Sequence, residues 1–208
     1  MRQIHLLGKN CLFLAILSIL TYSCISDSEA PILTELNSEK GLVTETQPDG
    51  ENLRKKGEFR YQEKFSNQIF PVPSSEGIML AGTGVGNATF LGKSLSFINQ
   101  LATSPTTTVG APVSLVFAAE LEELGLVNLG EEVHSVTVDK KGNAIFFSSL
   151  INTANPISDI RTEFEAEILI VGGAGSFEGV SGQGKVIGFY NPATGIGESS
   201  VLADLQFK

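Results

Sequence analysis

From residue 59 onward the chain is a succession of short β-prone runs separated by glycine, asparagine and proline. Turn signals such as Lys141-Gly142-Asn143 and Asn191-Pro192 separate neighbouring runs. Evenly spaced short strands with abundant glycine are typical of an antiparallel sandwich or barrel. We therefore predict an all-β domain, a single small antiparallel β-barrel of about eight strands. The runs expected to form strands are 59–65, 77–84, 87–99, 112–119, 132–138, 144–150, 162–171, 182–190 and 199–207.

The run 161–171 alternates most regularly. Phe164, Ala166 and Ile168 share one face of the expected strand, as does Ile170. The opposite face carries three carboxylates about 7 Å apart, those of Glu163, Glu165 and Glu167. Carboxylates facing a lumen would have raised pKa values and could act as acids or bases, whereas carboxylates facing water would form a solvated surface. Because the apolar set fills a core naturally, we expect the solvated outer face.

The segment 118–129 has helical spacing at Leu121 and Leu124, but Gly125 interrupts it. We expect a long loop here with one turn of helix. Five glutamates lie in or beside this loop, without the spaced Asp/Asn/Gly pattern of a known calcium loop.

The N-terminus is typical of a bacterial secretion signal. Arg2 and Lys9 precede an apolar run over residues 11–20, which is too short for a transmembrane helix. The run leads to Ser23-Cys24, and a small residue before a cysteine at this place resembles the bacterial lipobox, although Thr21 and Tyr22 depart from its usual form. We predict a signal peptide over residues 1–23 and a lipid anchor on Cys24. The alternatives are an uncleaved anchor or an ordinary cleavage near Ser23 or Ala30.

Residues 24–58 are rich in Ser, Glu, Asp, Thr and Asn, with no hydrophobic period, so we predict a flexible tether before a domain over residues 59–208. Without the signal, 185 residues remain, with 12 basic against 23 acidic residues and a net charge of −11. Such a chain has no electrostatic means of holding nucleic acid. Because Cys11 and Cys24 are the only cysteines, the domain must be stabilised by a packed core rather than by disulfides.

Three glycine-centred stretches occur in order at 82–93, 139–146 and 171–184. The first contains Gly84-Val-Gly86-Asn-Ala-Thr-Phe-Leu-Gly92-Lys93, and the third contains Gly172-Gly-Ala-Gly175-Ser-Phe-Glu-Gly179. This order resembles that of bacterial proteins with barrels like those of allene oxide cyclase and the plant dirigent proteins. The resemblance covers about residues 77–208. Ala174 and Phe90 depart from it, since many relatives have Thr and His there.

The resemblance implies a β-barrel. In the cyclase, catalysis is attributed to a polar lumen that holds a bound water, but those residues cannot be mapped onto this chain one by one. It therefore implies no catalytic residue here.

The third glycine stretch has a direct structural interpretation. We expect Gly172, Gly173 and Gly175 to adopt positive φ in a tight turn, and Phe177 to point into one end of the barrel. We expect Gly179 and Gly182 to leave room where the following strand bends. These residues are predicted to form a structural turn motif, not a catalytic site.

No motif predicts a cofactor or a metal. The run from Gly179 to Gly184-Lys185 nearly matches a phosphate loop, but Val186 replaces Ser or Thr and a strand is expected where that loop needs a helix. His134 is the one histidine after the signal, so no second imidazole or thiol exists for a transition-metal site. We expect it on the surface or in the barrel wall.

Two functions remain open. The first is a cell-envelope lipoprotein, most consistent with the outer membrane, whose barrel is a non-enzymatic binding or structural module for a small hydrophobic ligand. The second is a cyclase or isomerase acting on an apolar substrate in the lumen. Buried polar groups around a cavity of several hundred Å³ would favour the enzyme, and a lumen packed with Phe, Leu and Val would favour the binding module. Many phenylalanines and few polar side chains are expected to point inward, which favours the first.

Overall fold

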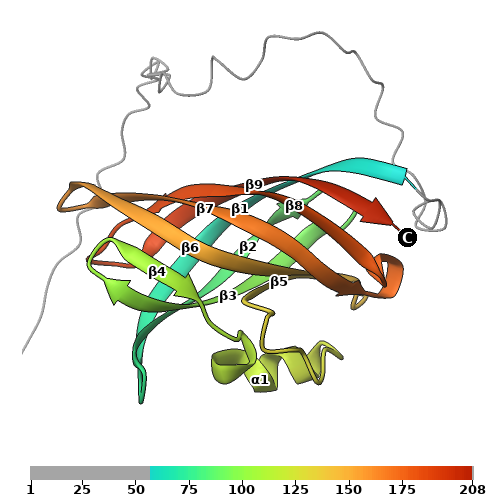
Figure 1. Ribbon diagram of the computed structural model, residues 1–208, viewed down its shortest axis with the longest axis horizontal. Coiled ribbons are helices and arrows are strands. Elements are labelled where there is room, and N and C mark those ends of the chain that lie inside the picture. The colour runs from blue at the N-terminus through green and yellow to red at the C-terminus, as the bar shows by residue number, and fades with distance from the viewer. Residues whose placement is uncertain (1–56, 208) are drawn as a thin grey trace, which may run out of the picture. The chain divides into compact units, whose positions relative to one another are not determined.

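The computed structural model describes residues 57–207, which form one antiparallel sheet of nine strands that closes into a barrel (Figure 1). The fold class predicted from the sequence is therefore confirmed. The strands are β1 (Gly57–Ser74), β2 (Gly77–Ala88), β3 (Gly92–Ser104), β4 (Thr107–Gly110), β5 (Ser135–Asp139), β6 (Ala144–Ser158), β7 (Arg161–Ala174), β8 (Val180–Tyr190) and β9 (Ile196–Phe207). One α-helix, α1 (Ser114–Glu123), and one 3₁₀ turn, η2 (Gly175–Phe177), complete the described elements.

The ring closes through two sets of strand pairs. The first strand lies between β2 and β9, so Glu63 is paired with Ala88 on one side and with Val201 on the other. On the far side of the ring, β6 pairs with both β4 and β5, and these two strands pair with β3. Full closure leaves no long unpaired strand edge among the described residues.

Alternation along β1 determines which side chains enter the lumen. Tyr61, Glu63 and Asn67 are buried, whereas the intervening Gln62 and Lys64 are exposed. In β7 the same rule buries Ala166, Ile168 and Ile170 and leaves Glu165 and Glu167 exposed, while Phe164 and Glu163 are half-buried. The solvated outer face expected for this glutamate row is therefore confirmed. Glu167 pairs with Lys185 at 3.3 Å, and Glu163 pairs with Arg161 at 3.0 Å.

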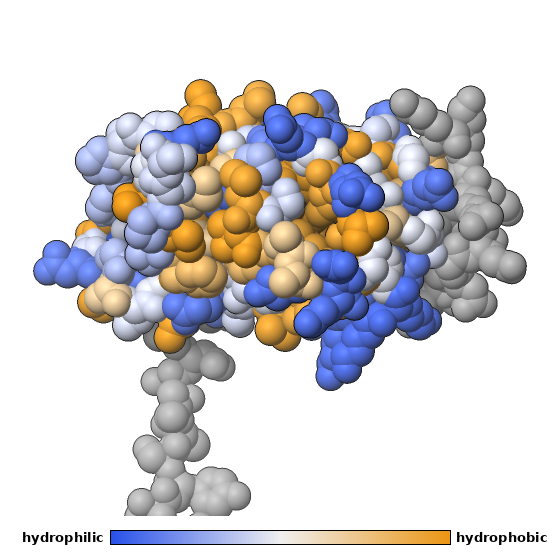
Figure 2. Space-filling model, turned by 90° about the horizontal axis from the view of Figure 1, so that it is seen from below, coloured by the Kyte–Doolittle hydropathy of each residue, from blue (hydrophilic) through white to orange (hydrophobic). Residues whose placement is uncertain are grey.

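Where they lie against α1, strands β3 and β5 have side chains buried on both faces of the sheet. Val136 and Val138 of β5 point outward and pack under the helix with Phe97 of β3, while Thr137 points into the lumen. Phe117 and Leu121 of α1 complete this outer cluster. Figure 1 shows α1 lying outside the barrel against β3 and β5, and Figure 2 shows the same side of the molecule, where hydrophobic and hydrophilic side chains are interspersed.

A second apolar cluster fills one end of the lumen. Phe177 of η2 and Phe207 of β9 have ring centroids 6.2 Å apart, and Leu205 and Tyr61 are fully buried beside them. Phe177 is 1% exposed, which places it in the interior.

One sequence expectation about the helical region is wrong, and another holds in part. Residues 112–119 do not form a strand, because α1 begins at Ser114. Residues 118–129 contain the expected helical segment and loop, since α1 ends at Glu123, but the helical segment is longer than one turn. The buried residues Val113, Phe117 and Leu121 recur every four positions, which is a helical spacing. It is hard to recognise in the sequence, because further apolar residues stand between Val113 and Phe117. The short strand β4 was not predicted.

The glycine stretch also differs in part from expectation. Gly175 and Gly179 have φ of +64° and +76°, as a turn between β7 and β8 requires. Gly172 and Gly173 instead lie within β7 and Gly182 within β8, so the expected positive φ at Gly172 and Gly173 is wrong. A Cβ on Gly182 would lie 2.1 Å from the Asp204 carbonyl oxygen, so this glycine permits close strand approach.

Candidate functional site

The barrel encloses a cavity beside the apolar cluster at its end. About 100 Å³ of it is open to the centres of water-sized molecules. For comparison, an apolar cavity of roughly 150 Å³ is enough to hold benzene. The polar side chains that line it are Glu63, Asn67, Ser96, Gln100, Thr108, Ser135, Thr137, Ser149, Asn152 and Ser199. The expectation that few polar side chains point inward is therefore wrong.

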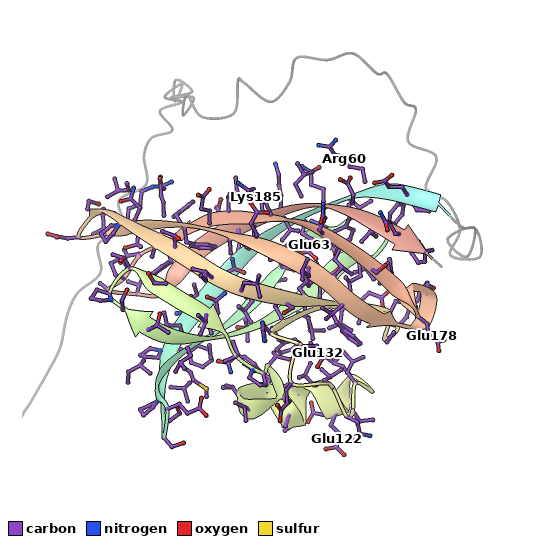
Figure 3. All side chains as sticks on the ribbon, viewed as in Figure 1. Arg60, Glu63, Glu122, Glu132, Glu178 and Lys185 are labelled. Atoms are coloured by element: carbon purple, nitrogen blue, oxygen red, sulfur yellow. The ribbon has the colours of Figure 1, made fainter. Side chains whose placement is uncertain are left out.

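Glu63 is the one carboxylate of the lining. It is 4% exposed, and in Figure 3 it lies within the barrel, whereas Arg60 and Lys185 extend outward. Burial raises the pKa of Glu63 to about 7, while hydrogen bonds from Tyr61 and Thr137 act to lower it. The Tyr61 hydroxyl donates to the Glu63 carboxylate, and burial raises the pKa of that tyrosine well above its ordinary value. Glu63 can therefore either hold or release a proton near neutral pH.

Asn67 lies four residues beyond Glu63 on the same face of β1. Its side-chain nitrogen donates to the Ser199 hydroxyl at 2.8 Å, but its side-chain oxygen is buried without a hydrogen-bond partner. The facing residue on β2 is Gly84, where a Cβ would lie 2.4 Å from this oxygen. Glycine at position 84 thus makes the space that the Asn67 amide occupies.

A second polar group comes from the other side of the ring. The Gln100 side-chain oxygen accepts hydrogen bonds from the Thr108 hydroxyl and from the Asn152 nitrogen, the latter at 2.9 Å. The Asn152 oxygen, like that of Asn67, is buried without a partner. Buried acceptors in this state need a donor from water or a ligand, because an unmet polar group costs about 1–3 kcal/mol.

The rest of the lining is mostly apolar. Val201, Val186 and Ile168 line it from β9, β8 and β7. Phe164 and Tyr190 lie farther along the same strands, with ring centroids 6.4 Å apart. The cavity thus combines a polar set, mainly from β1, β3, β4, β5 and β6, with an apolar wall mainly from β7, β8 and β9. This arrangement suits a small molecule with one apolar side and one polar end.

His134 does not line the cavity. Its Nδ1 accepts a hydrogen bond from the Ser149 backbone N–H at 3.0 Å, and burial lowers its pKa. Gly110 allows this position, since a Cβ there would lie 1.9 Å from Nδ1. The histidine is a half-buried part of the barrel wall, as the sequence led us to expect.

The structural turn motif predicted from the sequence does not form the cavity. Gly172, Gly173, Gly175, Phe177, Gly179 and Gly182 are absent from its lining. Cys24, the signal and the tether lie outside the described residues, apart from the last two tether positions, 57 and 58, which begin β1. Within residues 57–207 no group of three His, Cys, Asp or Glu side chains is placed to hold a metal ion, and no helix there is long and apolar enough to cross a membrane.

The sequence did contain a signal for Glu63. Phe59, Tyr61 and Phe65 alternate with exposed positions, and Glu63 falls on the aromatic face of that strand. A carboxylate on an otherwise aromatic face is a buried charge and hence a candidate functional group. Asn67 and Asn152 had no comparable signal, because both lie beyond the ends of the strands expected from sequence.

The fold and the lumen define a closed, all-β barrel with an internal polar site. Comparison of the chain with protein-family models, curated proteins and solved structures finds no match in any of the three.

Proposed function

We propose that the domain binds a small, mostly apolar molecule in the lumen of its barrel. The observation that carries this proposal is the buried carboxylate of Glu63 and the unpartnered oxygen of Asn67 facing a cavity whose other wall is apolar. A structural barrel has no need of buried polar groups without partners, because apolar packing would be more stable. Ligand binding supplies a reason for their presence.

Filling the cavity tests this proposal. Ala154 lines the lumen on β6, and its neighbour Asn155 is exposed, so Ala154→Phe and Asn155→Phe place the same side chain on opposite faces. We expect small molecules to copurify with the full chain and with Asn155→Phe, and to be lost from Ala154→Phe, as measured by native mass spectrometry. Equal ligand content in both variants would contradict lumen binding, and so would a full chain that carries and takes up no small molecule.

A second candidate is an acid–base enzyme, such as a cyclase or isomerase, that acts on the bound molecule. Glu63 favours it, because a pKa of about 7 is suited to proton transfer near neutral pH. The hydrogen bond from Tyr61 holds the carboxylate in place, as a catalytic acid or base requires.

The variant Glu63→Gln separates the two candidates, with Glu165→Gln on the exposed face of β7 as the matched control. An enzyme would lose turnover in Glu63→Gln while the copurifying molecule is still bound. Turnover is measured by incubating extracts with each variant and following their small molecules by mass spectrometry. A molecule recovered unchanged from the wild-type chain would oppose catalysis and favour the binding module.

We also propose that the chain is anchored in the cell envelope, most consistently the outer membrane, through lipid on Cys24. The support is the basic start, the apolar run and the small residue before Cys24 in the sequence. Two or more acyl chains anchor a protein stably, whereas one alone binds reversibly. Cys24→Ser should leave a soluble, unlipidated precursor that is released from membrane fractions, and Cys11→Ser should change neither the lipidation nor the fractionation. Membrane retention of Cys24→Ser would oppose the anchor.

The resemblance of residues 77–208 to the allene oxide cyclase and dirigent barrels is likewise a proposal. The order of the three glycine stretches supports it. An experimental structure of the domain, superposed on a dirigent barrel, tests it. A different strand order would oppose it.

A further inference from the structure

We propose that the ligand of the lumen presents a hydrogen-bond donor, a hydroxyl or amino group, and that the lumen rejects a carboxylate. This inference rests on the proposed binding function and specifies the chemical class of its ligand.

The unpartnered polar atoms of the cavity are acceptors. The nitrogen of Asn67 already donates to Ser199, and the nitrogen of Asn152 already donates to Gln100. The side-chain oxygens of both asparagines are buried and unmet, and Asn67 as a whole is 5% exposed. A hydroxyl or amino group can donate to them, whereas a carboxylate has only acceptors and would leave them unmet.

The charge of the lumen also disfavours a ligand that carries a carboxylate. Glu63 faces the cavity, and no Lys, Arg or His is among the described residues that line it. Lys64 and Lys185 are exposed on the outside, and Arg161 pairs with Glu163. When Glu63 is ionised, a ligand carboxylate would therefore meet a second negative charge in a poorly solvated space with no cation to pair with it. The hydroxyls of Ser96 and Thr137 can donate or accept, so they are compatible with a ligand that donates a hydrogen bond.

Three ligands with one apolar group test the inference. Propan-2-ol, propan-2-amine and 2-methylpropanoate share the isopropyl group and differ in the polar end. We expect the alcohol and the amine to shift the amide resonances of lumen residues in the full chain at pH 8, where Glu63 is mostly ionised, with dissociation constants at least tenfold lower than that of the carboxylate. A carboxylate that binds as tightly as the alcohol overturns this inference and leaves lumen binding intact. If none of the three shifts those resonances, lumen binding itself fails, and the inference with it.

Two substitutions test whether Asn67 and Glu63 cause the preference for a ligand that donates a hydrogen bond. Asn67→Ala removes an acceptor and should weaken alcohol binding about fivefold, the effect of losing one hydrogen bond, whereas Asn155→Ala on the outer face should not. Glu63→Gln removes the charge and should reduce the ratio between the dissociation constants of the carboxylate and the alcohol. Glu165→Gln should leave this ratio unchanged. Unaltered selectivity in folded Asn67→Ala and Glu63→Gln would overturn the assignment of these residues.

Discussion

The Tyr61 hydroxyl donates a hydrogen bond to the carboxylate of Glu63, two residues farther along the same inward face of β1. Both side chains are almost fully buried, at 0% and 4% exposed. The pair therefore marks the boundary between the apolar end of the lumen, to which Tyr61 belongs, and the cavity, which Glu63 lines.

The contribution of Glu63 to the stability of the protein should fall as the pH rises from about 4.5 to about 7, against an opposite contribution from His134, whose pKa folding lowers. Folding raises the pKa of Glu63 from 4.5 to about 7, so the folded state binds more protons than the unfolded state in this window. Ionising the buried group at neutral pH then costs on the order of 3 kcal/mol. Denaturant unfolding from pH 4 to 8 measures the slope. Glu63→Gln should remove it and Glu165→Gln should retain it. The same slope in Glu63→Gln would show that another group causes it.

Gly84→Ala should destabilise the barrel because a Cβ there meets the Asn67 amide. The added carbon would lie 2.4 Å from the Asn67 oxygen and 3.2 Å from the Phe65 ring, a contact that costs about 1–3 kcal/mol if the neighbours cannot move. Gly82→Ala is the control, since its nearest contact is 3.4 Å. Thermal unfolding of both variants, and of Gly84→Ala combined with Asn67→Ala, measures the coupling. Additive effects in the double variant would contradict the proposed contact.

Gly175→Ala should cost more than Gly172→Ala, although both glycines belong to one motif. Gly175 has φ of +64°, and a Cβ there would lie 2.4 Å from the Asn143 side-chain oxygen. Left-handed backbone alone costs an alanine roughly 1–2 kcal/mol. Gly172 lies in β7 with its nearest contact at 3.5 Å, so alanine there should be neutral within about 0.5 kcal/mol. Equal melting temperatures of the two variants would argue against the turn.

Leu121→Ala should destabilise the domain by about 2–5 kcal/mol, because this side chain fills the cluster between α1 and the sheet. Leu115 on the same helix is 62% exposed, so Leu115→Ala should change stability by less than about 0.5 kcal/mol. Denaturant midpoints of the two variants give the comparison. A small effect of Leu121→Ala would mean that the helix is not packed against β3 and β5.

Local pattern was sufficient to predict the barrel but not α1. Strict alternation at Phe164, Ala166 and Ile168 has one structural meaning, a strand with one buried face. The run from Val113 to Phe117 is compatible with two structures, because a short apolar segment fits a strand or a buried helix equally well. Tertiary context decides between them: the outer faces of Phe97 and Val136 need a cover, and α1 provides it.

The site was less predictable than the fold, because its residues become neighbours only through ring closure. Asn67 and Asn152 are far apart in the sequence, on strands that are not paired with each other. Neither lies within the runs expected from pattern, since β1 and β6 extend well past the residues that alternate clearly. Only Glu63, on an aromatic face, could have been identified before the fold was known.

The pairing of Gly57 with Phe207 has a kinetic consequence. The first strand of the ring joins the ninth, so this seam closes one of the longest loops the domain allows and carries a large loop-closure entropy. Until then the interior has an open side, and Glu63 remains in contact with water. Closing the seam takes the carboxylate out of water, so folding speed should depend on whether Glu63 is protonated when the seam closes.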